Sequence, residues 1–196
     1  MEKDLLRLCT SGSVDDGKST LVGRLLYEVG ALADDHIAAA KKATIGEFPE
    51  GIDFSLITDG LLAEREQKIT IDVAYRYFET ENRRFILADS PGHIQYTKNQ
   101  AAAASVSDAG VLVVDVTSGF SEQSRRHLMV MALLGVKHIL IAVNKMDLVA
   151  YARASFDNLR TEIGEFAARL RVDDIRFVPI SAKLGDNVTQ RSEKMS

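Results

Sequence analysis

The chain has 196 residues, of which 46% are hydrophobic, and this is enough for the core of one domain. Its 24 basic and 28 acidic side chains give a net charge of −4 without a strongly basic tract, so direct binding of nucleic acid is not favoured. No signal peptide and no apolar run near the length of a membrane span is visible, and the lone cysteine, Cys9, fits a core position in a reduced, cytoplasmic protein.

The first motif lies between a predicted strand and a predicted helix. An apolar strand over Leu5–Thr10 leads into Gly12–Ser19, which satisfies G-x-x-x-x-G-K-[ST], and a helical stripe of apolar residues covers Lys18–Val29. In such a loop, glycines let backbone N–H groups wrap an anion, and the helix adds the positive end of its dipole. Lys18 then supplies charge to the outer phosphates and Ser19 a magnesium ligand. An ordinary glycine-rich turn before a helix is the alternative.

The next part of the chain is weakly patterned. We expect a short helix within Ala31–Ala43, capped by Asp34, and an irregular stretch over Thr44–Gln67. So long an irregular stretch in a compact domain is often functional and mobile. At its end Thr70 is a candidate switch residue, whose hydroxyl ligates Mg²⁺ only when the third phosphate is present. A β-branched strand residue is the alternative interpretation of Thr70.

The remaining elements predict an α/β fold. Thr70–Tyr77 alternates with period two and pairs with Arg84–Asp89 as an antiparallel hairpin, whereas Ala109–Asp115 and His138–Val143 are almost wholly apolar, as parallel strands buried on both faces are. Helical patterns occupy residues 94–104, 122–134 and 152–170, and a last strand occupies 176–180. This order predicts a mostly parallel sheet with one antiparallel edge strand and helices on both faces.

The polar end of the chain lacks the helix that normally covers the last strand of such a sheet. Only a polar tail follows Ser181–Lys183. We therefore expect residues 1–196 to be a single domain cut before its closing helix, or the tail to be disordered.

A second motif, Asp89-Ser90-Pro91-Gly92-His93, follows the hairpin. An aspartate at the end of a strand opposite a phosphate loop is placed to hold Mg²⁺, usually through water. Gly92 brings a backbone N–H against a terminal phosphate, and His93 follows where an attacking water would lie. A helix cap at Asp89 and an exposed turn residue at His93 are the alternatives.

Two further motifs predict a guanine pocket. In Asn144-Lys145-Met146-Asp147, the Asp147 carboxylate accepts two hydrogen bonds from guanine N1–H and its exocyclic amine, which adenine does not offer in that arrangement. The alkyl stem of Lys145 lies along the base, and Asn144 ties this loop to the phosphate loop. A backbone N–H of Ser181-Ala182-Lys183 bonds guanine O6. Alone, each motif is an ordinary turn, but together and in this order they predict guanine nucleotide binding.

The set resembles the translational-factor class of GTPases, which have the P-loop NTPase G-domain fold. The tract that carries this resemblance is Glu64-Arg65-Glu66-Gln67 before Ile69-Thr70-Ile71-Asp72. Within the class, the chain looks like the large subunits of bacterial sulfate adenylyltransferases, a family that includes forms fused to adenylylsulfate kinase. The stretches that carry this second resemblance are Gly12-Ser13-Val14-Asp15-Asp16-Gly17-Lys18-Ser19-Thr20, Asp72–Phe78 and Ser124-Arg125-Arg126-His127.

The resemblance implies a GTP-binding and GTP-hydrolysing domain with GTP or GDP and Mg²⁺ bound. It implies that Ser19, Thr70 and Asp89 serve the metal and that His93 orients the hydrolytic water. It also implies a smaller catalytic subunit, an ATP sulfurylase that makes adenylylsulfate from ATP and sulfate, and β-barrel domains after the G domain. The base pocket then comprises Asn144, Lys145, Asp147, Ser181, Ala182 and Lys183.

The sequence departs from the class at a few positions. Lys68 stands where the class carries glycine, Ser90 replaces a common threonine or cysteine, and Asp16 replaces the histidine of elongation factors. Three other interpretations stay open: a translation factor, against which Asp16 and the lack of a basic surface argue; an ATP-using kinase of the same fold, against which the guanine motif argues; and a GTP-binding interaction module that does not hydrolyse.

Overall fold

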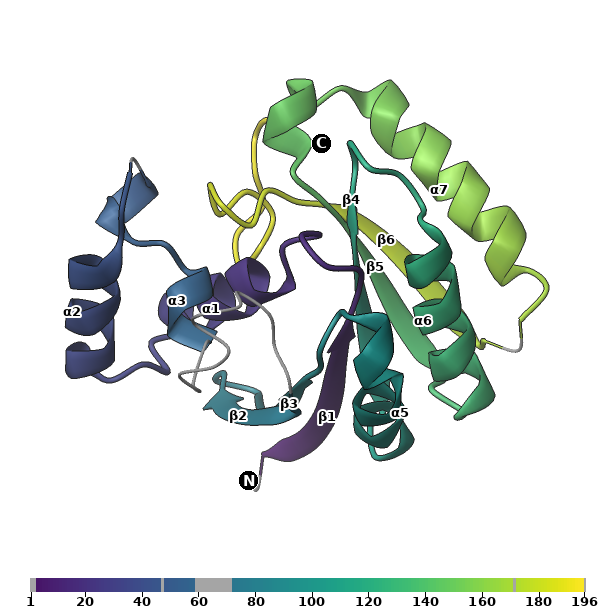
Figure 1. The fold of residues 1–196 in the computed structure, drawn as a ribbon, viewed down its shortest axis with the longest axis horizontal. Helices are drawn as coiled ribbons and strands as arrows, with labels where there is room; N and C mark the ends of the chain where they lie inside the picture. Colours follow the sequence, from purple (N-terminus) through teal and green to yellow (C-terminus); the bar gives the residue numbers. More distant parts are fainter. Residues whose placement is uncertain (1–2, 47, 59–71, 171, 196) are drawn as a thin grey trace.

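The computed structural model describes residues 3–46, 48–58, 72–170 and 172–195, which form one sheet with helices on both faces (Figure 1). The strand order is β2-β3-β1-β4-β5-β6, and every neighbouring pair is parallel except β2 and β3. The predicted fold class is therefore confirmed. The strands are β1 (Asp4–Ser11), β2 (Ala74–Glu79), β3 (Arg83–Asp89), β4 (Ala109–Asp115), β5 (His138–Asn144) and β6 (Asp174–Pro179).

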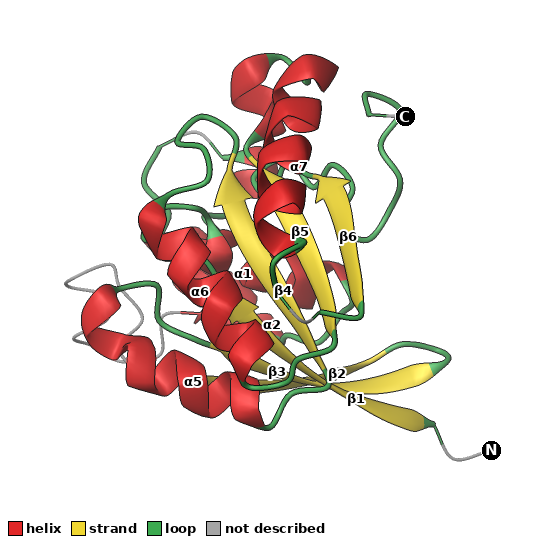
Figure 2. Cartoon of the chain, turned by 90° about the vertical axis from the view of Figure 1, so that its right-hand side faces the viewer, coloured by secondary structure: helices red, strands yellow, loops and turns green. Residues whose placement is uncertain are grey.

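Helices and 3-10 turns occupy most of the connections between the strands. Figure 2 shows α5, α6 and α7 along one face of the sheet. The helices are α1 (Lys18–Glu28), α2 (Asp34–Ala43), α3 (Ser55–Thr58), α5 (Thr97–Ser105), α6 (Glu122–Leu133) and α7 (Arg153–Ala167). The described residues also form the 3-10 turns η1 (Pro49–Gly51), η2 (Ile94–Tyr96) and η3 (Met146–Val149).

The core has two sides because successive residues of a strand point to opposite faces of the sheet. In β4, Leu112 and Val114 pack into the large cluster with α5, α6 and α7, whereas Val113 belongs to a smaller cluster on the other face. Such two-sided burial explains why this strand is apolar at nearly every position. Cys9 is 1% exposed in the large cluster, and burial raises the pKa of its thiol to about 11. The thiol is therefore neutral near pH 7, as expected of a residue in the core.

Two local predictions are corrected by the structure. The cap of α2 is Ala33, which has no side-chain acceptor, and Asp34 is the first helical residue, where its charge favours the helix dipole instead. The stretch after α2 is less irregular than expected: η1 and α3 form within it because Ile52 and Phe54, at 0% and 1% exposure, are buried against Ala40 and neighbouring side chains.

The polar tail after Lys183 folds back on the domain. Asn187 donates its side-chain amide to the Pro179 carbonyl at 2.9 Å, and Ser192 donates its hydroxyl to Asp186 at 2.7 Å. Met195 is 8% exposed and reaches the large core cluster. These residues therefore form turns rather than the disordered tail considered above.

No helix within the described part of the chain is long and apolar enough to cross a membrane.

A core substitution tests this packing. Ile141 in β5 is fully buried, so Ile141→Ala should lower the free energy of unfolding by about 2–5 kcal/mol in urea denaturation. Leu133→Ala is the matched control: Leu133 is 84% exposed on α6 and its loss should change stability by less than about 0.5 kcal/mol. Equal losses from the two variants would contradict the core assigned here.

Candidate functional site

The glycine-rich loop lies between β1 and α1, where neighbouring atoms leave no space for a side chain at its two glycines. A Cβ on Gly12 would lie 2.5 Å from the Val113 carbonyl oxygen, and one on Gly17 would lie 2.4 Å from the Asn144 amide nitrogen. Gly17 also adopts a left-handed φ of 91° as the N-cap of α1. The glycines of the motif are therefore required by close approach as well as by the turn.

Lys18 is held inside the loop. It is 7% exposed, and its Nζ donates to the carbonyl oxygens of Gly12 at 3.0 Å and Ser13 at 2.7 Å. Burial lowers the pKa of this ammonium, and the nearby carboxylates of Asp89, Asp16 and Asp15 act in the opposite direction. The loop thus concentrates a positive charge where the motif places the outer phosphates of a nucleotide.

The segment after β3 lies against the same loop. Asp89 is 2% exposed and accepts a hydrogen bond from the Thr10 hydroxyl at 2.7 Å. A Cβ on Gly92 would lie 2.3 Å from Lys18 Nζ and 2.8 Å from the Gly12 carbonyl oxygen, so only glycine fits this approach. The structure therefore brings the second motif to the phosphate loop.

His93 faces its own turn. Its Nδ1 accepts from the Gln95 N–H at 3.3 Å, and its ring centroid lies 6.1 Å from that of Tyr96. The ring is half-buried directly after Gly92. Thr70, which is predicted to respond to the third phosphate, lies outside the described residues, as do Lys68 and the Glu64–Gln67 tract.

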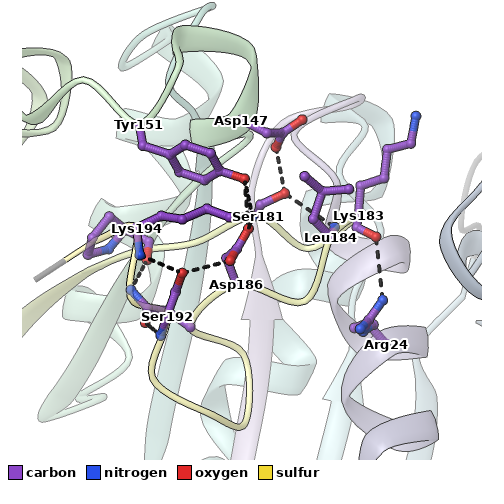
Figure 3. Close-up of polar contacts among 11 residues, drawn as sticks. Arg24, Asp147, Tyr151, Ser181, Lys183, Leu184, Asp186, Ser192 and Lys194 are labelled. Carbon is purple, nitrogen blue, oxygen red and sulfur yellow. Dashed lines mark hydrogen bonds and ion pairs between the residues drawn. The ribbon is translucent and has the colours of Figure 1, made fainter.

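Asn144 joins three motifs. Its side-chain amide donates to the Asp16 carbonyl oxygen at 2.8 Å, and its Oδ1 accepts from the Ala182 N–H at 3.0 Å. Asp147 Oδ1 accepts from the Ser181 hydroxyl at 2.5 Å (Figure 3). Hydrogen bonds therefore connect the phosphate loop with both parts of the predicted base pocket, at the carboxyl ends of β1, β5 and β6.

Lys145 forms an ion pair that the sequence did not predict. Its Nζ lies 2.8 Å from Asp115 Oδ2, at the end of β4. Burial alone would raise the pKa of Asp115, but hydrogen bonds from Lys145 and Thr117 outweigh it and the pKa is lowered. This ionised partner holds the lysine stem beside the Asn144–Asp147 turn, where Lys145 itself has a left-handed φ of 63°.

A buried polar network connects the phosphate loop to α6. Asp16 is 4% exposed and accepts from the Ser13 N–H at 2.8 Å, while the Ser13 hydroxyl lies 2.7 Å from that of Ser121, the N-cap of α6. Burial raises the pKa of Asp16, although the Ser13 N–H and the Lys18 charge oppose it. The aspartate that departs from elongation factors thus stabilises the shape of the loop.

His127 on α6 belongs to this network. It is 0% exposed, and its Nδ1 accepts from the Gly12 N–H at 3.0 Å. Burial, and next the charge of Lys18, lower its pKa to about 4. A neutral ring is needed because a protonated Nδ1 has no lone pair to accept the bond. The only sequence signal for this role was its place in the Ser124–His127 stretch.

The other predicted residues occupy the rim of the site. Val14 and Asp15 are exposed on the loop, Ser19 and Thr20 are half-buried in the first turn of α1, and Lys183 is exposed beyond Ala182.

Comparisons with known proteins agree with this arrangement. A family model described as "Elongation factor Tu GTP binding domain" matches residues 3–195. Sulfate adenylyltransferase subunit 1 from Psychromonas ingrahamii is 52% identical over 196 residues, which cover 99% of this chain and 42% of that protein. "Bifunctional enzyme CysN/CysC" from Mycobacterium tuberculosis is 53% identical over 190 residues, covering 97% of this chain and 31% of that protein.

A solved structure shows the same fold. The crystal structure of the bacterial selenocysteine-specific elongation factor EF-Sec matches with a TM-score of 0.71 and 27% identity, covering 94% of this chain and 27% of that one. The predicted resemblance to the translational-factor class and to sulfate adenylyltransferase large subunits is therefore confirmed. The chain spans less than half the length of each of these relatives.

The neutral state of His127 predicts a pH effect on stability. Its folded pKa of about 4 lies below the ordinary 6.5, so the unfolded chain binds more protons between these values and stability falls as pH decreases through this window. The loss should be about 2 kcal/mol between pH values of about 7 and 5.

Urea denaturation of His127→Gln checks this effect, since glutamine still offers an acceptor to Gly12 without titrating. The variant should lose about 2 kcal/mol less than the original chain over the same window. The exposed His36→Gln is the control and should retain the full loss; because Asp16 is present in all three proteins, its own titration cancels. Parallel pH curves for His127→Gln and the original chain would contradict a buried neutral ring.

Proposed function

We propose that this chain, which belongs to the family of elongation factor Tu GTP-binding domains, binds GTP and GDP with Mg²⁺ and hydrolyses GTP as part of a cytoplasmic sulfate adenylyltransferase. The observation that carries the proposal is the Asn144 side chain, hydrogen-bonded to the phosphate loop at Asp16 and to the base loop at Ala182. One nucleotide then spans both loops, with its phosphates at Lys18 and its base at Asp147.

The base pocket favours guanine by its hydrogen-bonding pattern. The Asp147 carboxylate accepts only, which matches the adjacent N1–H and exocyclic amine of guanine. We expect guanine O6 to accept from a backbone N–H of Ser181-Ala182-Lys183, where the Ala182 N–H already donates to Asn144 Oδ1 at 3.0 Å. Adenine presents the opposite pattern and would leave these groups unpaired at a cost of about 2–4 kcal/mol.

The donor set near Lys18 suits Mg²⁺. A hydroxyl at Ser19 and a carboxylate at Asp89 are hard oxygen ligands, and Mg²⁺ usually takes one or two of these together with substrate phosphates and waters. No group of three or more His, Cys, Asp or Glu side chains suited to a metal exists among the residues described, so the phosphates complete the proposed site. When bound, the ion neutralises charge on the β- and γ-phosphates.

Hydrolysis of GTP to GDP and phosphate would depend on positioning and electrostatics. The backbone N–H groups of the loop and the Lys18 ammonium stabilise charge on the phosphate oxygens, and the Gly92 N–H meets the terminal phosphate. His93, directly after Gly92, aligns the attacking water once its ring leaves the Gln95 N–H. Thr70, outside the described residues, is proposed as a metal ligand that responds to the third phosphate.

The proposed partner follows from the relatives. The name of the Psychromonas protein, subunit 1, implies a second subunit. We propose a small ATP sulfurylase subunit that joins sulfate to the adenylyl group of ATP and releases pyrophosphate. That reaction is strongly uphill, so coupling to GTP hydrolysis would drive it. Co-expression with such a subunit should give a complex that makes adenylylsulfate faster with GTP than with GDP. Equal rates would exclude the coupling.

The guanine assignment predicts an exchange of base specificity. Asp147→Asn replaces one acceptor by a donor, so GDP affinity should fall by about 30- to 1000-fold. Xanthosine diphosphate, which carries a carbonyl in place of the amine, should bind the variant better than GDP. Calorimetric titration of both nucleotides measures this, and Asp157→Asn on α7 is the control with unchanged affinities. Undiminished GDP binding by Asp147→Asn would exclude the proposed pocket.

The role of His93 predicts a kinetic defect without a binding defect. His93→Ala should slow single-turnover GTP hydrolysis by about 100-fold or more, because it removes the group that aligns water. GDP affinity should be unchanged, since the hydrogen bond and the ring contact of His93 are made with Gln95 and Tyr96 rather than with the loop. His36→Ala should hydrolyse GTP at the original rate. Equal rates for His93→Ala and the original chain would show that another residue aligns the attacking water.

A further inference from the structure

Arg24 is a buried charge that the nucleotide site described above does not use. It lies on α1 at 7% exposure, and its Nε pairs with Glu28 one turn later on the same helix. Its guanidinium also lies over the Phe54 ring, with Cζ 4.8 Å from the ring centroid. Because burial of a charge is costly unless several partners satisfy it, the arrangement around Arg24 must be specific.

One partner comes from the segment before α3. Glu50 receives two parallel hydrogen bonds, from Nη1 to Oε2 at 3.0 Å and from Nη2 to Oε1 at 3.2 Å. Glu50 adopts a left-handed φ of 56°, a conformation that a non-glycine residue keeps only when its surroundings compensate. The bidentate pair with Arg24 is a contact able to do so.

The same segment is fastened to α1 by packing. A Cβ on Gly23 would lie 2.0 Å from the Phe54 carbonyl oxygen, and the Tyr27 ring lies 5.3 Å from the Phe54 ring. The segment Phe48–Phe54 therefore has a defined place beside α1. It precedes Thr70 in the chain.

The other partner of Arg24 comes from the base loop. Nη1 donates to the Lys183 carbonyl oxygen at 3.4 Å, and Figure 3 shows this carbonyl directed toward Arg24 on α1, while the Lys183 side chain points away from it. A Cβ on Gly185 would lie 2.3 Å from Arg24 Nη2, so the loop backbone packs directly on the guanidinium. Lys183 in turn places its Nζ 5.1 Å from the Phe48 ring centroid.

We propose that Arg24 is a positioning residue that connects the guanine loop Ser181–Gly185 to the segment Phe48–Phe54. A base held by the Ser181–Lys183 stretch orders the loop, the Lys183 carbonyl and Gly185 hold the guanidinium, and the guanidinium holds Glu50. Binding of guanine nucleotide therefore stabilises the segment that leads toward Thr70, from the base side rather than from the phosphates. The inference rests on the guanine site proposed above.

Nucleotide release tests this connection. Arg24→Lys keeps the charge but loses the forked geometry, and Glu50→Gln keeps the shape but loses the charge. Each should release a fluorescent GDP analogue about 10-fold faster than the original chain in stopped-flow experiments, since each removes one charge-assisted contact. The double variant should be no faster than the single ones, because both changes break the same link.

Hydrogen exchange separates positioning from a merely structural role. GDP should protect backbone amides of residues 48–56 in the original chain, and in Glu50→Gln it should protect the phosphate loop but no longer that segment. A structural role alone would raise exchange in the segment equally with and without GDP. Arg153→Lys, which disturbs the exposed pair with Asp157 on α7, is the control and should behave as the original chain.

The outcomes distinguish the two proposals. Failure of the original chain to bind GDP would overturn the guanine site itself. Normal binding with unchanged release and unchanged protection in both variants would overturn only the link through Arg24. If circular dichroism shows that Arg24→Lys does not fold, the release and exchange measurements on Glu50→Gln alone test the link. The Glu50 side chain is 39% exposed and tolerates an amide.

Discussion

The side-chain amide of Asn144 is hydrogen-bonded to two loops that are 128 and 38 residues away in the chain. It spans them because β5 lies between β6, which leads into the base loop, and β4, on whose other side β1 leads into the phosphate loop. An amide is suited to this place, since it donates to the Asp16 carbonyl and accepts from the Ala182 N–H at the same time. Its two hydrogen bonds thus connect the phosphate loop directly to the base loop.

A second constraint is the balance of charge beneath the phosphate loop. Lys18 is buried among the carboxylates of Asp89 and Asp16. Burial first, and the charge of Lys18 second, lowers the pKa of His127, so that its neutral ring accepts a hydrogen bond from Gly12. The positive charge thus remains directed toward the loop rather than shared with α6. Asp16 holds the Ser13 N–H and so turns the loop backbone inward. The polar network fixes the shape of the loop, which is the proposed site of the nucleotide phosphates.

Much of this architecture could be predicted from local patterns. The apolar strand at Ala109–Asp115 was expected in full because burial on both faces leaves no other composition, and the glycine-rich loop was recognisable because its spacing is dictated by the backbone. The cap of α2 was misjudged since Asp34 is equally at home in the first helical turn. The fold of η1 and α3 was missed because their burial depends on α1 and α2 rather than on any period of their own.

The side chains that sequence could not identify share one property: their partners lie far away in the chain and become neighbours only in the folded domain. His127 meets Gly12 across 115 residues, and Arg24 meets the Lys183 carbonyl across 159. From sequence alone, an arginine within an amphipathic helix is interpreted as a solvated charge, because the loops that bury it come from distant parts of the chain. The motifs of a nucleotide site therefore show where the ligand contacts the chain, whereas the links between the motifs, on which coupled movement depends, are decided by topology.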